Sequence, residues 1–452
     1  MGQKVVRQNA VAPGPSGAGP TPRRVALLGA GLSAALPLYA FLLLGDLVWS
    51  LKERGVQELV KAQLREVSQD ALLLNILFGA LPALLALFVG PLVGAWSDRT
   101  RTRLGRRIPF LLACALMLAA SLVGLAFAQP LAAYLLDGGG AGERAHVRNV
   151  IFCMSLFWAM FELFSITGNA LFIALINDTV PHAVLGRFFG LFRIVSLAVG
   201  AAFFYFVFGN DLPAIASNVM LGIAAAYLFG FLLLCAGVRE PAYPPPTIEP
   251  VRMGLGRLRA EGGSAPWFYL LLFAALGIAT ICVLPVNINS YNAIGQFGVD
   301  RSSYGRAVSI TYCISILLAW PLGWLADRIH PLRVGFIALV MYALSMLGAW
   351  QFATGSLSFL VWMVVHGVLA GVFLTGTASL LPKLLPRERF SELAAFSASV
   401  TALLTVVFTL GLGVVLDWSG RDFRLIFLAA GMVATVGACL WYALLKMHAR
   451  RA

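Results

Sequence analysis

The sequence has 452 residues, of which 60% are hydrophobic and only 12% charged, and its mean hydropathy is +0.86. Soluble domains carry about twice this share of charge, so the composition excludes an ordinary soluble protein and indicates a chain that crosses a membrane many times. The net charge of +13 does not indicate nucleic-acid binding, because the basic residues lie in short segments between apolar runs and form no basic domain.

Apolar runs of about twenty residues or more predict the membrane-crossing helices. Residues 1–24, rich in Pro, Gly and Ser, are typical of a disordered cytoplasmic tail, and residues 447–452 form a second tail. Residues 239–265 combine several prolines with a basic stretch, which predicts a cytoplasmic linker between an N-terminal bundle (25–238) and a C-terminal bundle (266–446). The sequence thus predicts an all-α membrane protein with twelve transmembrane helices in two six-helix pseudo-symmetric bundles. The expected helices are 25–50, 71–96, 109–130, 149–176, 188–208, 217–238, 266–290, 304–326, 334–354, 359–381, 393–416 and 424–446.

Residues 52–70, between the first two predicted helices, carry charges of both signs. We expect this segment to be a solvated helical extension of the first or the second helix, and not a binding motif.

The distribution of basic residues predicts the orientation. With the N-terminus in the cytoplasm, 22 of the 33 Lys and Arg residues fall on the cytoplasmic side, 10 fall outside, and Arg193 lies within a helix. This bias follows the positive-inside rule and predicts that both termini are cytoplasmic.

The segment between the second and third predicted helices is strongly basic. Gly94 lies four residues before Asp98, so a neighbouring helix can approach closely beside a carboxylate that accepts from arginines or from a helix N-terminus. The start of the pattern recurs 229 residues later, where Asp327 takes the place of Asp98. This offset is close to half the chain, as expected for two similar halves.

This pattern, with Arg103-Leu-Gly105-Arg106-Arg107-Ile-Pro-Phe as its second part, resembles the loop between helices 2 and 3 of major facilitator superfamily transporters. Its lengthened form is similar to that of the glycoside–pentoside–hexuronide cation symporters and the sucrose and maltose proton symporters. Asp178-Thr-Val-Pro, followed by Gly-Arg187, resembles the loop between helices 4 and 5 of the same superfamily.

The resemblance implies a conformational switch on the cytoplasmic side, whose ion pairs form in the outward-open state and break in the inward-open state. The alternative is an inert cytoplasmic cluster of ion pairs. The candidate switch residues are Gly94, Asp98, Arg99, Arg103, Gly105, Arg106, Arg107, Asp178, Arg187, Asp327 and Arg328.

Ionisable residues inside predicted helices are costly in hydrocarbon, so Asp46, Glu162 and Arg193 are functional candidates. Around Glu162, the residues Trp158, Ser165 and Asn169 recur at helical spacing and predict one polar and aromatic stripe. A carboxylate can accept from two hydroxyl groups and an indole can cover the C–H face of a sugar, so the stripe suits a sugar subsite. The alternative is a polar contact between helices.

The same three charges resemble the sugar-binding set of melibiose-type carriers, and Asp46 and Glu162 would also serve proton coupling. Arg193 lies only six residues after Arg187, about 9 Å along a helix, so it could instead pair with Asp178 or line the inner gate. Asp46, near the end of its predicted helix, could be an outer-gate group, the proton site or an interface anchor. The second predicted helix offers only Asn75 and no paired acids for sodium, which favours protons as the coupling ion.

In the C-terminal half, Asn287 and Tyr291 share one helix face after Pro285, where they could complete a sugar site, form the outer gate or be an ordinary polar helix end. His366 could titrate near neutral pH and couple protons, or be a neutral core residue.

No catalytic grouping, nucleotide-binding loop or metal-ligand spacing stands out. The six cysteines all lie in apolar runs without Cys-x-x-Cys spacing. We therefore expect no cofactor, no bound metal and no enzyme activity, and work driven by an ion gradient or by the solute's own gradient.

The sequence predicts a monomeric transporter in the inner (plasma) membrane that moves a sugar or glycoside by alternating access, coupled to protons rather than sodium. Its partners would be the solute, the coupling cation and the lipid bilayer, and not nucleic acid. The alternatives are an efflux antiporter for amphipathic organic solutes and a non-transporting sensor or assembly factor with the same fold.

Overall fold

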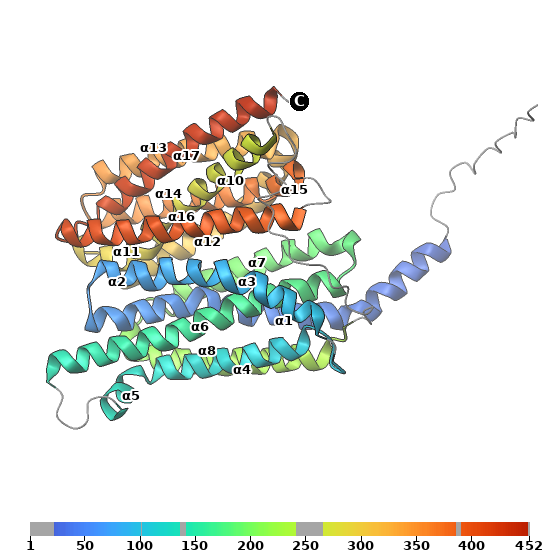
Figure 1. The fold of residues 1–452 in the computed structure, drawn as a ribbon, viewed down its shortest axis with the longest axis horizontal. Helices are drawn as coiled ribbons and strands as arrows, with labels where there is room; N and C mark the ends of the chain where they lie inside the picture. Colours follow the sequence, from blue (N-terminus) through green and yellow to red (C-terminus); the bar gives the residue numbers. More distant parts are fainter. Residues whose placement is uncertain (1–21, 101, 136–141, 241–264, 386–389, 451–452) are drawn as a thin grey trace, which may run out of the picture.

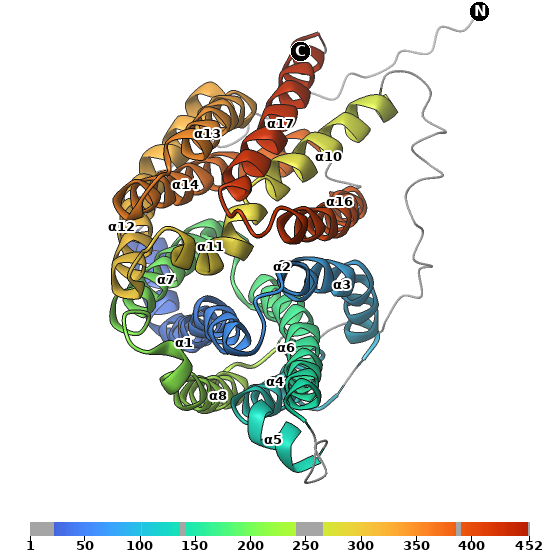
Figure 2. The same cartoon turned by 90° about the vertical axis from the view of Figure 1, so that its left-hand side faces the viewer.

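The computed structural model describes residues 22–100, 102–135, 142–240, 265–385 and 390–450, and it consists of helices in two layers (Figure 1). The side chains of 22–35 and of a few residues in the helices and loops are not described. The N-terminal half forms one layer and the C-terminal half the other, as the end-on view also shows (Figure 2).

The N-terminal layer contains six long helical units. They are α1 (Pro22–Val67), the continuous unit α2 (Ala71–Asn75), η1 (Ile76–Ala80) and α3 (Leu81–Arg99), then α4 (Ile108–Ala126), α6 (Glu143–Thr179), α7 (His182–Phe206) and α8 (Leu212–Gly237). The short helix α5 (Ala128–Leu135) packs against α6.

The C-terminal layer also contains six long helical units. Its units are the broken helix α10 (Ala265–Ile281) and α11 (Leu284–Gln296), then α12 (Arg301–Ile329), α13 (Pro331–Phe352), α14 (Ser356–Thr377) with the short α15 (Leu380–Leu384), α16 (Phe390–Trp418) and α17 (Leu425–Ala449). The prediction of twelve helices in two six-helix bundles is confirmed.

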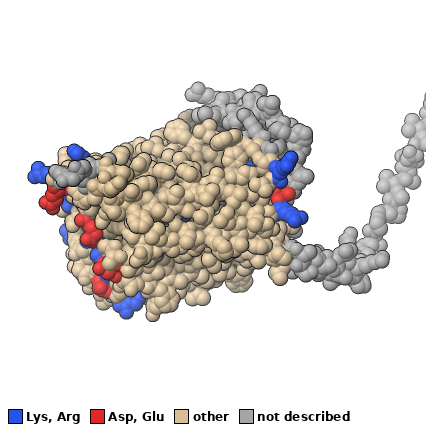
Figure 3. Space-filling model, turned by 90° about the horizontal axis from the view of Figure 1, so that it is seen from below, with Lys and Arg blue, Asp and Glu red and all other residues tan. Residues whose placement is uncertain are grey.

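Eleven of these units in the described ranges are long and apolar enough to cross a membrane. The twelfth, α1, carries many charges. In the space-filling view, acidic and basic side chains gather at the two ends of the described bundle and leave a wide band without charge between them (Figure 3). That band has the character of a surface that faces hydrocarbon.

The two ends of the bundle are named here by the connections that they carry. The α1–α2 end holds the connection between Val67 and Ala71 together with the α11–α12 and α16–α17 connections. The α3–α4 end holds the basic loop between Arg99 and Ile108 and the α12–α13 connection.

The largest departure from the expected helices is in α1. The segment 52–70 was expected to be solvated, but α1 continues to Val67 inside the bundle, and both Lys52 and Lys61 are only 1% exposed. The helix can bury these charges because each lysine has a partner: Ser165 for Lys52, and Glu58 for Lys61.

The second membrane helix contains a π-helical turn, η1, whose register explains a buried tryptophan. The N–H of Leu81 donates to the carbonyl of Ile76, five residues back, so in this register the carbonyl of Leu77 would accept from residue 82. That residue is Pro82, which has no N–H. The indole of Trp158 donates to the Leu77 carbonyl instead, at 2.8 Å.

The seventh membrane helix is interrupted between α10 and α11, as the proline at position 285 predicts. The short helix α11 is unusually polar for a buried segment: Asn289, Ser290 and Asn292 are all less than 9% exposed. Asn289 accepts from Asn75 of α2 at 3.1 Å, and Ser290 is hydrogen-bonded to Tyr304 of α12 at 2.7 Å. A broken helix in the membrane therefore presents polar groups between the two layers.

Candidate functional site

A cavity of about 460 Å³ lies between the two halves. It is bounded by α1 and α7 of the N-terminal half and by α11, α12 and α14 of the C-terminal half. Its volume is in the range of small-molecule sites, roughly 300–1,000 Å³. Twelve of its twenty lining residues are polar or ionisable: Glu53, Arg54, Gln57, Glu58, Arg193, Asn287, Ser290, Tyr304, Thr311, Tyr312, Ser315 and His366.

At the α1–α2 end, polar contacts join the two halves. The carboxylate of Asp417 on α16 accepts from the backbone N–H groups of Ala71 and Leu72 at 3.0 and 2.8 Å, which caps the N-terminus of α2. Arg65 of α1 donates to the carbonyl of Tyr291 on α11 at 3.0 Å. Asp211 and Arg301 form an ion pair across the same end at 3.0 Å. We call these the closing contacts.

One face of α1 carries most of the ionisable groups that approach the cavity. Arg54 donates to Ser196 of α7 at 3.1 Å and to Tyr312 of α12 at 3.5 Å, so one guanidinium contacts both halves. Its Nε atom is buried and has no partner among the described residues. Arg193, on α7, lines the same cavity and lies within electrostatic range of Arg54.

A chain of polar contacts connects α1 to the core of the C-terminal half. Lys61 pairs with Glu58 at 3.0 Å and donates to the backbone carbonyl of Asn287 at 2.9 Å. The side-chain oxygen of Asn287 lies 3.0 Å from Nε2 of His366, and Nδ1 of His366 lies 2.8 Å from the hydroxyl of Tyr342. A titratable imidazole at the cavity wall is thereby linked through an amide to a buried ion pair.

Glu162 belongs to a separate cluster deeper in the N-terminal half. Lys52 donates to Ser165 at 2.6 Å, lies 3.5 Å from the ring centroid of Trp49, and interacts electrostatically with Glu162. The stripe expected on α6 is therefore organised around a lysine of α1. Ser165 of α6 and the indole of Trp49 on α1 share this lysine with Glu162, whereas Trp158 does not contact it among the described interactions.

Asp46 is 7% exposed and lies within electrostatic range of Glu53 and Arg54. Its Oδ2 atom has no hydrogen-bond partner among the described residues. Asp46 therefore lies on the same helix as the charged wall, about two turns before Glu53, without bordering the cavity itself.

Of the seven expected solute contacts, Arg193 and Asn287 border the cavity, and besides Asp46 and Glu162 three more do not. Trp158 is 1% exposed, and its ring packs against Phe78 and Phe161 while its indole donates to Leu77, so in this conformation it lies in the core of the N-terminal half. Asn169 is exposed on α6. Tyr291 is 1% exposed, packs against Phe208, and does not share the cavity with Asn287.

The charged wall formed by Glu53, Arg54, Gln57 and Glu58 was missed by the sequence analysis. A usable signal is present, because Asp46, Ser50, Arg54, Glu58, Lys61 and Arg65 recur every three or four residues, which places them on one helical face. The segment is so rich in charge that its hydropathy resembles that of an outer loop.

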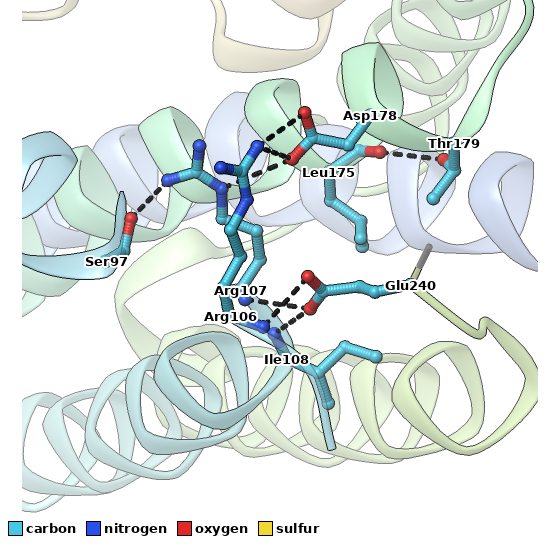
Figure 4. A network of polar contacts seen from close by, with 8 residues as sticks. All are labelled: Ser97, Arg106, Arg107, Ile108, Leu175, Asp178, Thr179 and Glu240. Carbon is cyan, nitrogen blue, oxygen red and sulfur yellow. Dashed lines mark hydrogen bonds and ion pairs between the residues drawn. The ribbon is translucent and has the colours of Figure 1, made fainter. Parts of the chain in front are cut away.

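The basic loop at the α3–α4 end is held by two acidic groups of the N-terminal half (Figure 4). Arg106 donates to both oxygens of Asp178 at 2.9 and 2.8 Å, and Arg107 contacts the same carboxylate at 3.4 Å and also bonds Ser97 of α3. The carboxylate of Glu240, after α8, accepts from the backbone N–H groups of Arg106, Arg107 and Ile108 and so caps the N-terminus of α4.

Gly105 allows this arrangement. Its φ of +115° is unfavourable for other residues, and a Cβ atom there would lie 2.5 Å from the Glu240 carboxylate.

The expectation that the ion pairs of this loop break in the inward-open state does not fit the pairs of Asp178. Arg106, Arg107 and Asp178 all belong to the N-terminal half, so a movement of one half against the other leaves their contacts intact. Arg103 is exposed, and Arg328 lies 5.1 Å from the ring of Trp324. The side chains of Gly94, Asp98, Arg99, Arg187 and Asp327 lie outside the described part of the structure.

No group of three or more His, Cys, Asp or Glu side chains among the described residues could hold a metal ion. The six cysteines are free thiols.

Comparisons with known proteins identify the fold. The family model of the Major Facilitator Superfamily matches residues 267–452. The crystal structure of a D-xylose–proton symporter is similar, with a TM-score of 0.66 and 14% identity over 90% of this chain and 97% of that chain.

A bacterial homologue of the iron transporter ferroportin is similar in two states. Its inward-facing structure has a TM-score of 0.64 and 17% identity over 90% of this chain and 98% of that chain. Its outward-facing structure has a TM-score of 0.55 and 18% identity over 90% of this chain and 99% of that chain. This chain therefore has the major facilitator fold. A comparison of the sequence with curated proteins finds no match.

Proposed function

We propose that this chain, a multi-span membrane protein with the major facilitator fold, is a secondary transporter that moves a sugar or glycoside by alternating access with proton coupling. The observation that carries the proposal is the polar cavity between the halves together with the closing contacts at one of its ends. A site between two rigid bundles that is closed on one side is what alternating access requires.

The chemistry of the cavity wall favours a hydroxyl-rich solute over an amphipathic one. Asn287, Gln57 and Arg54 offer amide and guanidinium groups, and Tyr304 and Tyr312 offer rings that can cover the C–H face of a sugar. An efflux carrier for amphipathic solutes would be expected to have a largely apolar wall, whereas most residues of this wall are polar.

We assign the α3–α4 end to the cytoplasm, because the basic loop lies there. With this orientation, the closing contacts lie on the outside and the structure is an inward-facing state. The higher TM-score to the inward-facing than to the outward-facing form of the ferroportin homologue, 0.64 against 0.55, supports the assignment.

Proton coupling is assigned to Asp46, Glu162 and His366, to which the geometry adds Glu58. Glu58 borders the cavity, and its Oε2 atom is buried without a hydrogen-bond partner among the described residues. A carboxylate in this position can take up a proton when the neighbouring Lys61 moves away, which would link its charge to the movement of the halves.

The test uses the full-length protein in proteoliposomes with a panel of labelled pentoses, hexoses and disaccharides. We expect at least one sugar to accumulate when the external medium is acidic, and a protonophore to abolish the accumulation. Asn287→Ala should reduce uptake about tenfold or more, because it removes an amide from the cavity wall and disconnects His366. Ser399→Ala, on α16 outside the cavity wall, should leave uptake unchanged.

Glu58→Gln separates binding from coupling. It should retain sugar exchange across the membrane in the absence of a gradient but lose accumulation driven by the pH gradient. If no sugar of the panel is exchanged by folded protein, while amphipathic cations are expelled, the efflux alternative is correct and the sugar proposal is wrong.

A further inference from the structure

A second cavity lies on the outer surface of the C-terminal half, in the groove between α13 and α17. It has a volume of about 450 Å³ and is lined almost entirely by apolar side chains. Phe336, Val340 and Leu344 line it from α13, and Cys439 and Tyr442 line it from α17. Leu344 is 67% exposed, so the groove faces the surroundings of the bundle and does not communicate with the central cavity.

Basic side chains stand at one end of this groove, the α3–α4 end. Arg333 lies one turn before Phe336 on α13, and Lys446 lies one turn after Tyr442 on α17, so the two residues flank the mouth of the groove. Both are exposed, and neither has an acidic partner among the described residues. The Nζ atom of Lys446 lies 4.6 Å from the ring of Tyr442, which directs it along the groove wall.

Further basic groups surround this mouth. The rings of His330 and His448 are stacked with centroids 5.1 Å apart. Burial lowers the pKa of His330, and the neighbouring His448, Lys383 and Arg333 lower it further. The neighbours named here that act on the charge of His330 are all basic. The basic character of this mouth, with Arg333 and Lys446 exposed, favours a bound anion.

An apolar groove that ends in a basic cluster at the level of the membrane interface is complementary to an anionic phospholipid. Acyl chains fit the groove, and a phosphate with a net negative headgroup fits the basic mouth. A free phosphate has no acyl chain to fill the groove. A zwitterionic lipid has no net negative charge to attract Arg333 and Lys446.

We propose that α13 and α17 form a specific binding site for an anionic phospholipid, with its acyl chain along Phe336, Leu344 and Tyr442 and its headgroup at Arg333 and Lys446. In the orientation proposed above, this lipid belongs to the inner leaflet. The inference does not depend on which solute is transported.

The experiment uses the full-length protein, purified in detergent, stripped of lipid, and titrated with dioleoyl phosphatidylglycerol or dioleoyl phosphatidylcholine. Native mass spectrometry counts the lipids that remain bound. The wild type should retain phosphatidylglycerol about tenfold better than phosphatidylcholine, because each basic group near the interface favours an anionic lipid.

The double variant R333A/K446A should lose this preference, so that the two lipids are retained equally. The matched control is Arg239→Ala, which removes an exposed arginine after α8, away from the groove, and should keep the preference. Leu344→Trp, which fills the groove, should lower the retention of both lipids, and glycerol 3-phosphate in excess should not displace phosphatidylglycerol.

All of the substituted side chains are exposed, so circular dichroism and monodisperse elution should be those of the wild type. Equal retention of the two lipids by the wild type would overturn the proposal. So would a preference that persists in R333A/K446A, or displacement by glycerol 3-phosphate, which would reduce the site to a surface that binds any phosphate.

Discussion

Lys61 illustrates how a single charge is tolerated in the middle of a helical bundle. Its ammonium group is almost fully buried, yet it contacts Glu58, the carbonyl of Asn287 and, at 5.6 Å, the ring of Phe78. A buried ion pair adds little stability relative to an apolar pair, but removal of one partner leaves the other charge uncompensated. The stability of the folded protein therefore depends on Glu58 and Lys61 keeping their charges balanced.

From this dependence we predict that Lys61→Met destabilises the protein by about 3 kcal/mol, because it leaves the Glu58 carboxylate without its partner. The double variant Glu58→Gln/Lys61→Met, which removes both charges, should regain most of this loss. Thermal unfolding in detergent gives both values. If the single and the double variants are equally unstable, the charge balance is not the cause.

Asp422 permits a prediction about pH. Its pKa is lowered to about 2 from 3.8, first because Arg424 donates to its carboxylate and also because Gln296 donates to it at 2.8 Å. A carboxyl whose pKa is lowered by folding stabilises the folded state above its ordinary pKa, and this contribution disappears as the pH falls through the lowered value.

Asp422→Asn should therefore lower stability at pH 7 by about 1 kcal/mol or less, since the ion pair is largely exposed and screened. The difference from the wild type should narrow from about pH 4 downward and vanish near pH 2, as followed by the melting temperature in parallel buffers. A difference that is constant over this range would contradict the assignment.

At the scale of single elements, the π-helical turn η1 accounts for Trp158 as a structural residue. We predict that Trp158→Phe costs about 1–3 kcal/mol, because the Leu77 carbonyl becomes a buried acceptor without a donor. The apparent affinity for the transported solute should not change. In this background Pro82→Ala supplies the missing N–H and should restore part of the loss. A changed KM with unchanged stability would instead return Trp158 to the solute site.

The contact between α2 and α16 offers a second test at this scale. A Cβ atom at Gly413 would lie 2.8 Å from the Cα atom of Leu72, which belongs to the other half, whereas Gly411 on the same helix has no atom within 4 Å. Gly413→Ala should therefore separate α16 from α2 and increase the population open at the α1–α2 end.

The matched control, Gly411→Ala, adds the same methyl group without a contact and should only raise helix stability slightly. Spin labels at Gln69→Cys and Ser419→Cys, in a background without native cysteines, report the separation of the two halves. Equal distance distributions in the two alanine variants would show that the contact does not control opening.

Most of the elements, but only a few residues of the cavity wall, such as Arg193, Asn287 and His366, could be predicted from the sequence. Apolar runs locate all twelve helices, since hydrophobicity decides where a helix crosses the bilayer. They do not show that α1 continues to Val67 inside the bundle, because Lys52 and Lys61 look like loop residues until their partners Ser165 and Glu58 are placed in space. The hydrogen bond from Trp158 to Leu77 could not be predicted, because nothing in the spacing of α6 shows that Pro82 leaves a free acceptor on another helix.

At the scale of the whole molecule, the two ends of the bundle are held in different ways. The α3–α4 end is tied by Asp178 and Glu240 within one half, whereas the closing contacts join one half to the other. Rotation of the halves must therefore break the closing contacts and can preserve the ion pairs of the basic loop.

Asp178→Asn tests this distinction. We predict that it slows exchange transport by about threefold to tenfold, since the charged contact of Arg106 Nη2 with both Asp178 oxygens holds α6 against the start of α4 and keeps the N-terminal half rigid. The apparent solute affinity should stay the same. A loss of affinity with unchanged turnover would place Asp178 at the solute site. Exchange kinetics in proteoliposomes measure both quantities.

The way in which Asp417 holds α2 has a consequence for the speed of a transport cycle. Its oxygens accept from main-chain N–H groups that water can satisfy equally well once the halves separate. Each such exchange changes the free energy by only about 1 kcal/mol, because bonds to protein are replaced by bonds to solvent. If the molecule alternates as proposed, these contacts can therefore close the α1–α2 end and still break within milliseconds, because no large activation barrier opposes their exchange for water.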